Sequence, residues 1–337
     1  MRFMCRMESA QVADFVAVLS ALGRCGKMVH LAFAPDKVFL GSISDDDAIV
    51  AFADLEPRVM FSEFRSESRA GNIVNLEAPT DMLLGCLKHG AQASSTVMKL
   101  SKRHGSPSLS CVVSRDDGIT LTHDVPVLVV RRTEAEAMER PDIPEMSVLM
   151  QIHGDDPFKA VVDRMKTLAK HVHVEIDPRG AMAVSAQNEI VAVKSFFRDL
   201  TPLELRDASG DVRPSEAAAA KVDAKLLSKV LMACSGHKRT ALVVGSSPAS
   251  VFFVHMRLSR GAGGVTVLIP VVQEATDEAL MPGLAATPEA QAAGAPSSAS
   301  ASSASSSSSS AATGAPAGGP SKELLDSRAP KRAREVG

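Results

Sequence analysis

The residues that could do chemistry in this chain of 337 residues form no recognisable catalytic set. A phosphate-binding loop needs two glycines that frame four residues, followed by Lys and then Ser or Thr. Residues 23–28, Gly-Arg-Cys-Gly-Lys-Met, have a shorter spacing and no hydroxyl group, so they are better interpreted as a helix end. His123 and Asp124 are neighbours, but they and the scattered serines match neither a nucleophile elbow nor a triad. We therefore expect no enzyme activity and no cofactor.

The sequence also gives little indication of a metal site. His171 and His173 would share one face of a strand, but a third ligand is missing, and half-exposed strand histidines are commoner than metal ligands. Residues 45–47, three aspartates, are more typical of an exposed hairpin turn than of a cation site. The cysteines are Cys5, Cys25, Cys86, Cys111 and Cys234. Their odd number and the lack of a CxxC pair favour reduced thiols in a cytosolic or nuclear protein, without a zinc site.

Composition excludes further classes of protein. The formal net charge of −2 gives no global basic field that would attract nucleic acid. No apolar run approaches the length of a membrane span and the N-terminus has no signal-peptide pattern, so we expect no membrane partner. The sequence contains no Trp and no Tyr, which argues against a module that stacks single-stranded bases on aromatic rings.

An internal repeat gives the strongest structural signal. Phe15 corresponds to Phe158 and Leu31 to Val174, and both pairs are 158 − 15 = 143 positions apart. At the same offset, Thr80 and Asp223 each precede a similar apolar spacing and are interpreted as helix N-caps. We therefore expect two copies of one domain, each with helices and antiparallel strands.

Periodicity predicts the elements of each copy. In the first copy we expect helices capped by Ser9 and by Thr80, and strands at 2–7, 29–33, 38–43, 48–53, 60–64, 73–76, 96–100, 109–113 and 119–130. In the second copy we expect helices capped by Asp156 and by Asp223, and strands that include 171–176 and 181–186.

Composition also predicts the domain boundaries. The expected segments are a first domain at 1–131, an interdomain linker at 132–146, a second domain at 147–273 and a disordered tail at 274–337. The tail is rich in Ala, Ser, Gly and Pro, and such a composition buries too little apolar surface to offset its ordering entropy. Its basic end, with Lys331, Arg332 and Arg334, is typical of a nuclear-import signal, although an ordinary basic terminus is the alternative.

The predicted apolar stripes turn lysines outward, and point charges of this kind suit contact with DNA phosphates irrespective of sequence. An ordinary solvated face is the other interpretation. On the helices of the second copy we expect Ser228 to face outward with the lysines, and the first copy offers fewer basic residues. The candidate DNA-facing residues are Lys88, Lys159, Lys166, Lys170, Lys221, Lys225 and Lys229.

Several short motifs, in this order, resemble PCNA-type sliding clamps, and most closely the Hus-one family of subunits of the checkpoint clamp, the 9-1-1 complex. They are Met1-Arg-Phe, Pro35-Asp-Lys, Thr122-His-Asp-Val-Pro-Val, Val161-Val-Asp-Arg-Met-Lys, His171-Val-His-Val-Glu-Ile, Phe197-Arg-Asp-Leu and Leu268-Ile-Pro-Val. The resemblance spans about 1–273 and excludes the tail. It implies an α+β fold of two tandem PCNA-like domains, with the helices on one face of antiparallel sheets.

The resemblance also implies a function. The chain would form a heterotrimeric ring with Rad-nine and Rad-one type subunits, be loaded on double-stranded DNA by a clamp loader at damage sites, and recruit checkpoint-signalling and repair proteins in the nucleus. A replicative homotrimeric PCNA-like clamp, a processivity factor, and an unrelated two-domain enzyme remain alternatives.

By analogy with the family, two strands, at 126–131 and 189–197, would pair with neighbouring subunits, since an unpaired strand edge is otherwise a liability. Pairing inside the chain is the alternative. The candidate interface residues are Val127, Leu128, Val129, Val130, Ile190, Val191, Ala192 and Val193.

Overall fold

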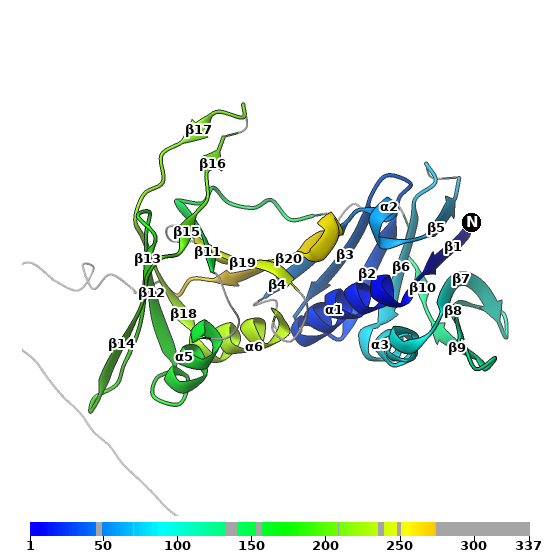
Figure 1. Ribbon diagram of the computed structural model, residues 1–337, viewed down its shortest axis with the longest axis horizontal. Coiled ribbons are helices and arrows are strands. Elements are labelled where there is room, and N and C mark those ends of the chain that lie inside the picture. Colours follow the sequence, from blue (N-terminus) through cyan, green and yellow to red (C-terminus); the bar gives the residue numbers. More distant parts are fainter. Residues whose placement is uncertain are drawn as a thin grey trace, which may run out of the picture. The chain divides into compact units, whose positions relative to one another are not determined.

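A strand–helix–three-strand unit recurs four times along the computed structural model (Figure 1). The structure describes residues 1–44, 49–69, 71–131, 140–152, 157–207, 209–234, 239–247 and 251–273, all within one unit, Met1–Thr276. The 45–47 turn, the Asp156 cap, most of the expected linker and the tail with its basic end lie outside the described residues.

The first half of the chain contains two of these units. The first comprises β1 (Arg2–Met7), α1 (Ser9–Cys25), β2 (Met28–Phe33), β3 (Val38–Ile43) and β4 (Val50–Leu55). The short helix α2 (Pro57–Met60) and β5 (Glu63–Glu67) follow. The second unit comprises β6 (Val74–Pro79), α3 (Thr80–Lys88), β7 (Ser95–Arg103), β8 (Ser106–Ser114) and β9 (Thr120–Pro126), and β10 (Leu128–Val129) comes after it.

The second half repeats this order. The third unit comprises β11 (Val148–Ile152), α5 (Pro157–Met165), β12 (His171–Asp177), β13 (Ala181–Gln187) and β14 (Ala192–Phe197). Three short strands follow, namely β15 (Thr201–Pro202), β16 (Leu205–Arg206) and β17 (Val212–Arg213). The fourth unit comprises β18 (Ala218–Asp223), α6 (Ala224–Cys234), β19 (Arg239–Ser246), β20 (Val251–Leu258) and β21 (Gly263–Pro270).

Within each half, the first strand of one unit joins the three later strands of the other. The resulting sheets have the orders β5-β1-β7-β8-β9, β10-β6-β2-β3-β4-β21-β20-β19-β11-β15 and β14-β13-β12-β18, and β16 pairs with β17. The ten-stranded sheet contains strands of both halves because β4 pairs antiparallel with β21, with Ala53 opposite Val265 and Ala51 opposite Val267. Because one sheet runs through both halves, the sheets do not mark the predicted domain boundaries, and those boundaries stay a prediction.

The helices pack on one side of the sheets, where α5, α6, α1 and α3 follow one another (Figure 1). Phe15 of α1 and Phe158 of α5 are fully or almost fully buried, as the repeat requires of equivalent core positions. Burial of an aromatic side chain of this size contributes about 2–3 kcal/mol. In the described part of the chain, no helix is both long and apolar enough to cross a bilayer.

Helix starts follow the predicted pattern only in part. Asp223 does cap α6, because its Oδ1 accepts hydrogen bonds from the backbone N–H groups of Lys225 and Leu226 at 2.9 and 3.0 Å. Helix α1 starts differently from the prediction: its N-cap is Glu8, which forms a capping box with Gln11. Thr80 is not a cap either, since it is the first residue of α3 and its side chain is buried.

Two predicted strands in the first half were wrong in detail. Residues 60–64 do not form one strand, because Pro57 starts the short helix α2 and β5 begins only at Glu63. The predicted strand 119–130 is interrupted at Val127, after Pro126, and its two parts join different sheets as β9 and β10.

Candidate nucleic-acid interface and sheet edges

A cluster of ion pairs and hydrogen bonds connects α5 to α6 within the predicted basic surface. The Asp163 carboxylate is 2.7 Å from Lys166 Nζ and 3.6 Å from Lys159 Nζ. The buried Ser228 hydroxyl donates a hydrogen bond to Asp163 at 2.6 Å and accepts one from Lys166 at 2.8 Å. Partial burial raises the pKa of the Asp163 carboxyl, but the hydrogen bonds from Lys166 and Ser228 outweigh it and lower that pKa below its usual value. Two of the predicted lysines are therefore already engaged by a carboxylate.

A second basic group lies where α1 meets α6. Arg24, Lys27 and Lys229 line one recess of about 370 Å³, and Lys229 also lines a neighbouring recess of about 450 Å³ with Lys225. Burial raises the pKa of the Cys25 thiol to about 11 and outweighs the nearby Lys229 cation, which acts to lower that pKa. The structure therefore joins cations from both halves of the chain on the helix side.

The other predicted lysines are more scattered. Lys88 is exposed at the end of α3, and Lys170 is exposed immediately before β12. The expectation that Lys221 lies on an outward helix face is wrong, because Lys221 belongs to β18. It alternates there with Ala220 and Val222, whose side chains are buried in the core under the helices, so Lys221 lies on the opposite face of the sheet. Ser228 was also predicted to point outward, and it is buried.

The predicted interface residues occupy two sheet margins. Leu128 and Val129 form β10, which pairs with β6 inside the chain and ends the ten-stranded sheet, while Val127 is buried. Val130 is partly buried, and its N–H donates a hydrogen bond to the Asn75 carbonyl. Their contact with another subunit stays a prediction.

The second margin is β14, which ends the four-stranded sheet and includes Ala192 and Val193. Ile190 and Val191 lie in the preceding turn, where the Asn188 side chain accepts hydrogen bonds from both backbone N–H groups. Ile190 is 90% exposed, an unusual position for a large apolar side chain. In the five-stranded sheet, β9 forms a third margin and has no neighbour beyond it among the described strands.

No arrangement for metal binding emerges within the described residues. His171 and His173 do share one face of β12, but no group of three His, Cys, Asp or Glu side chains in that part of the chain is placed to hold a metal ion. All five cysteines are buried and none is in a disulfide, in agreement with the expectation of reduced thiols.

Sequence reasoning did not predict the hydrogen bond between Asp163 and Ser228. It also did not place Arg24 and Lys27 in one recess with Lys229 of α6. The spacing of Asp163, four residues after Lys159 and three before Lys166, is the one signal that could have indicated the ion pairs. The contact between α1 and α6 depends on pairing of β4 with β21, which no local pattern reports.

Comparison with known proteins adds a family to this geometry. The family described as "Hus1-like protein" matches residues 1–273. "Checkpoint protein hus1" of Schizosaccharomyces pombe is 25% identical over 269 residues, which cover 76% of this chain and 93% of the relative. "Checkpoint protein HUS1" of Homo sapiens is 24% identical over 234 residues, covering 67% and 84%. "Checkpoint protein hus1 homolog" of Dictyostelium discoideum is 21% identical over 201 residues, covering 58% and 73%.

The matched segment coincides with the described repeat and stops where the predicted tail begins. The mostly antiparallel sheets with helices on one side agree with the predicted α+β architecture of a PCNA-like clamp. The chain therefore belongs to the Hus1-like family and has its PCNA-like clamp fold.

Proposed function

We propose that this chain is one subunit of a heterotrimeric checkpoint sliding clamp, with Rad-nine and Rad-one type subunits as its partners. The ring would be loaded by a clamp loader, encircle double-stranded DNA at damage sites, and recruit checkpoint-signalling and repair proteins in the nucleus. The names of the relatives, which are checkpoint proteins, support the checkpoint role. The chain would act as a scaffold, without catalysis.

The single observation that carries the ring proposal is the position of the open sheet edges. Strands β4 and β21 are the last strands of the first and fourth units, and they pair antiparallel inside the chain. Strands β9 and β14 are the last strands of the second and third units, and each ends its sheet among the described strands. The repeat therefore offers the same kind of edge for a junction between chains, with β9 of one subunit against β14 of another.

The mass of the complex in solution tests this proposal. We expect the purified full chain to be monomeric alone and to form a 1:1:1 complex with Rad-nine and Rad-one type subunits. A homotrimer would instead indicate a replicative clamp, and a monomer that joins neither partner would contradict ring formation. Deletion of residues 328–337 should separately reduce nuclear accumulation if Lys331, Arg332 and Arg334 act in import.

The DNA face is tested by paired substitutions that remove the same charge from opposite faces. Lys225 and Lys229 are exposed on α6, and their joint replacement by Ala should flatten the dependence of log K on log salt by at most about 2, because each lost phosphate contact removes about 0.9. Joint replacement of Lys99 and Lys221 by Ala is the control, since both lie on strand faces turned away from the helices. Equal slopes for the two variants would contradict a DNA-facing helix side.

A further inference from the structure

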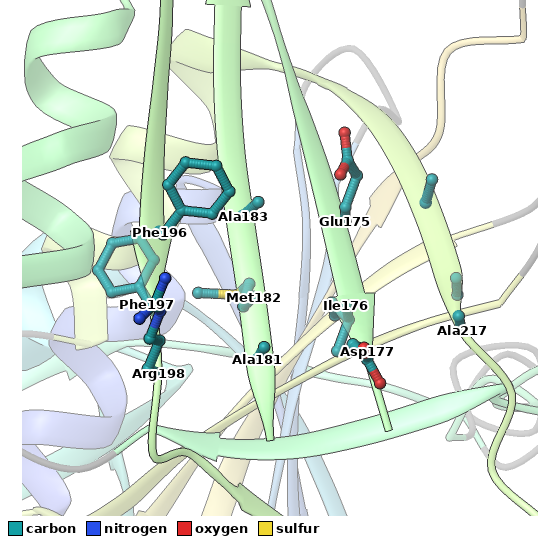
Figure 2. A pocket seen from close by; sticks show the side chains of 12 residues that line it. Glu175, Ile176, Asp177, Ala181, Met182, Ala183, Phe196, Phe197, Arg198 and Ala217 are labelled. Atoms are coloured by element: carbon teal, nitrogen blue, oxygen red, sulfur yellow. The ribbon is translucent and has the colours of Figure 1, made fainter. Parts of the chain in front are cut away.

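The sheet face opposite α5 and α6 carries a shallow recess of about 420 Å³ on strands β14, β13, β12 and β18 (Figure 2). Its centre follows from the register, in which Phe196 lies opposite Ala183, Ala183 opposite Glu175, and Glu175 opposite Ala219. Neighbouring residues on these strands, such as Val184 and Ala220, point to the core instead.

Methyl groups form much of the floor of this recess. Ala181 and Ala183 come from β13, and Ala217 and Ala219 come from β18 and the residue just before it. Alanine is depleted in strands and contributes little cross-strand packing, so these side chains do little to stabilise the sheet itself. Their small size leaves space beside Phe196, which is 66% exposed. An exposed aromatic ring above an alanine floor is the composition of an anchor site for a large apolar side chain.

The charges around the recess are not equally engaged. Glu175 accepts hydrogen bonds from Lys194 Nζ at 2.8 and 3.0 Å, and Lys194 also lies 5.7 Å from the centre of the Phe196 ring. Asp177 accepts a hydrogen bond from the backbone N–H of Arg179 at 2.9 Å. Arg198 lines the recess, is exposed, and has no ion pair within the described part of the chain. Asp177 is likewise in no ion pair within the described residues, but it lies on β12, two strands from β14, so the open charge on the β14 side of the recess is positive.

We propose that this recess binds an extended segment of another protein in which a large apolar side chain is flanked by acidic residues. The apolar side chain fills the space between the alanine floor and Phe196, and a carboxylate of the segment pairs with Arg198. The recess borders β14, so the bound segment lies beside the edge proposed above for a neighbouring subunit. The inference rests on the proposed scaffold role, but the isolated chain contains the whole site.

The test measures binding of a defined probe by the full-length chain. The probe is a fluorescein-labelled peptide with one Phe between two Glu residues in a Ser/Gly background, followed by fluorescence anisotropy. Chemical shifts of ¹³C-labelled alanine methyl groups locate it, and we expect those of Ala181, Ala183, Ala217 and Ala219 to change. Replacing Phe by Ala, or both Glu by Lys, should weaken binding about tenfold or more.

Two substitutions in the protein have matched controls. Ala183→Leu fills the recess and Arg198→Glu reverses its open charge, and each should weaken the probe about tenfold. Ser185→Leu lies on the same strand face beyond the recess, and Arg179→Glu changes an exposed arginine in the adjacent turn, so both should leave affinity within about twofold.

Three results would overturn the inference: no binding of the acidic probe, equal binding of the basic peptide, or equal loss in the control variants. The mass of the complex with the two partner subunits is measured for the same variants. If the chain assembles with its partners but does not bind the peptide, the proposed recess is refuted and the ring is not. If the unsubstituted chain does not assemble with its partners, the proposed ring is refuted.

Discussion

The carboxylate of Asp163 is expected to compete with DNA phosphates for lysines on the helix side, so Asp163→Asn should strengthen DNA binding by the assembled ring. Its oxygens are 2.7 Å from Lys166 Nζ and 3.6 Å from Lys159 Nζ, on the same side of the sheets as the exposed Lys225. The substitution removes one negative charge and preserves the size of the side chain, and its amide oxygen can still accept the Ser228 hydrogen bond.

The magnitude follows from the number of lysines released. Each additional phosphate contact steepens the slope of log K against log salt by about 0.9, so release of Lys166 alone adds about 0.9 and release of both lysines about 1.8. The cost to folding is small, because the side chains of Asp163 and Lys166 are 28% and 31% exposed. Ion pairs with this access to solvent contribute about 0.5–1 kcal/mol.

Fluorescence anisotropy of a short labelled duplex, titrated with the assembled complex over a series of salt concentrations, measures the slope. Asp177→Asn is the control, since it removes the same charge from the sheet face opposite the helices. An unchanged or shallower slope in Asp163→Asn would refute the reasoning, because lysines that face phosphates must respond to loss of their competing carboxylate.

Three further predictions concern stability. Gly263 has φ of 117°, and a Cβ atom there would overlap the carbonyl oxygen of Asp54. Gly263→Ala should therefore lower the free energy of unfolding, measured by thermal denaturation, by about 3 kcal/mol. Gly261→Ala, with φ of 72° and open space, should cost only about 1 kcal/mol, and equal costs would contradict a close β4–β21 approach. Burial and the charge of Arg257 lower the pKa of His255 from 6.5 to about 4, although Asp54 opposes them. The unfolded chain therefore takes up the proton first, and at most about 3 kcal/mol of stability, present above pH 6.5, should be lost as pH falls towards 4. Denaturant unfolding should show a flatter pH profile in His255→Gln; an identical profile would exclude His255 as the cause. Ser228→Ala should cost about 1–2 kcal/mol in urea unfolding, since it removes hydrogen bonds to two charged groups, and a loss near zero would show that water replaces them.

The sequence was informative wherever the physics is local. Phe15 and Phe158 were identified as equivalent because an apolar stripe at helical spacing must face a core, and both are buried at that place in α1 and α5. Asp223 was correctly predicted as a cap since its short carboxylate precedes a helical stripe.

Errors arose where two local patterns compete. Lys221, Lys225 and Lys229 are four residues apart, which is typical of one helix face, but Asp223 ends a strand before the helix begins. The pairing of β4 with β21 joins residues about 200 positions apart, and no local pattern specifies a partner over such a separation. The exchange of first strands between units was unpredictable for the same reason.

The same position in the repeat is paired inside the chain in β4 and β21 and lies at a sheet edge in β9 and β14, and the exposed side chains differ accordingly. In β4, Phe52 is buried on the outer face of the sheet, where Arg140 stacks over its ring at 5.4 Å from the ring centre. The edge strands β9 and β14 instead carry mostly exposed and partly buried residues, with Val125 of β9 buried, and charged side chains such as Asp124 and Lys194 lie along them. Polar residues of this kind keep an open edge soluble and discourage random pairing. An edge that must survive alone in water cannot be as apolar as β4 or β21, so the proposed junction between subunits has to gain its specificity from the few exposed apolar residues beside it, above all Ile190.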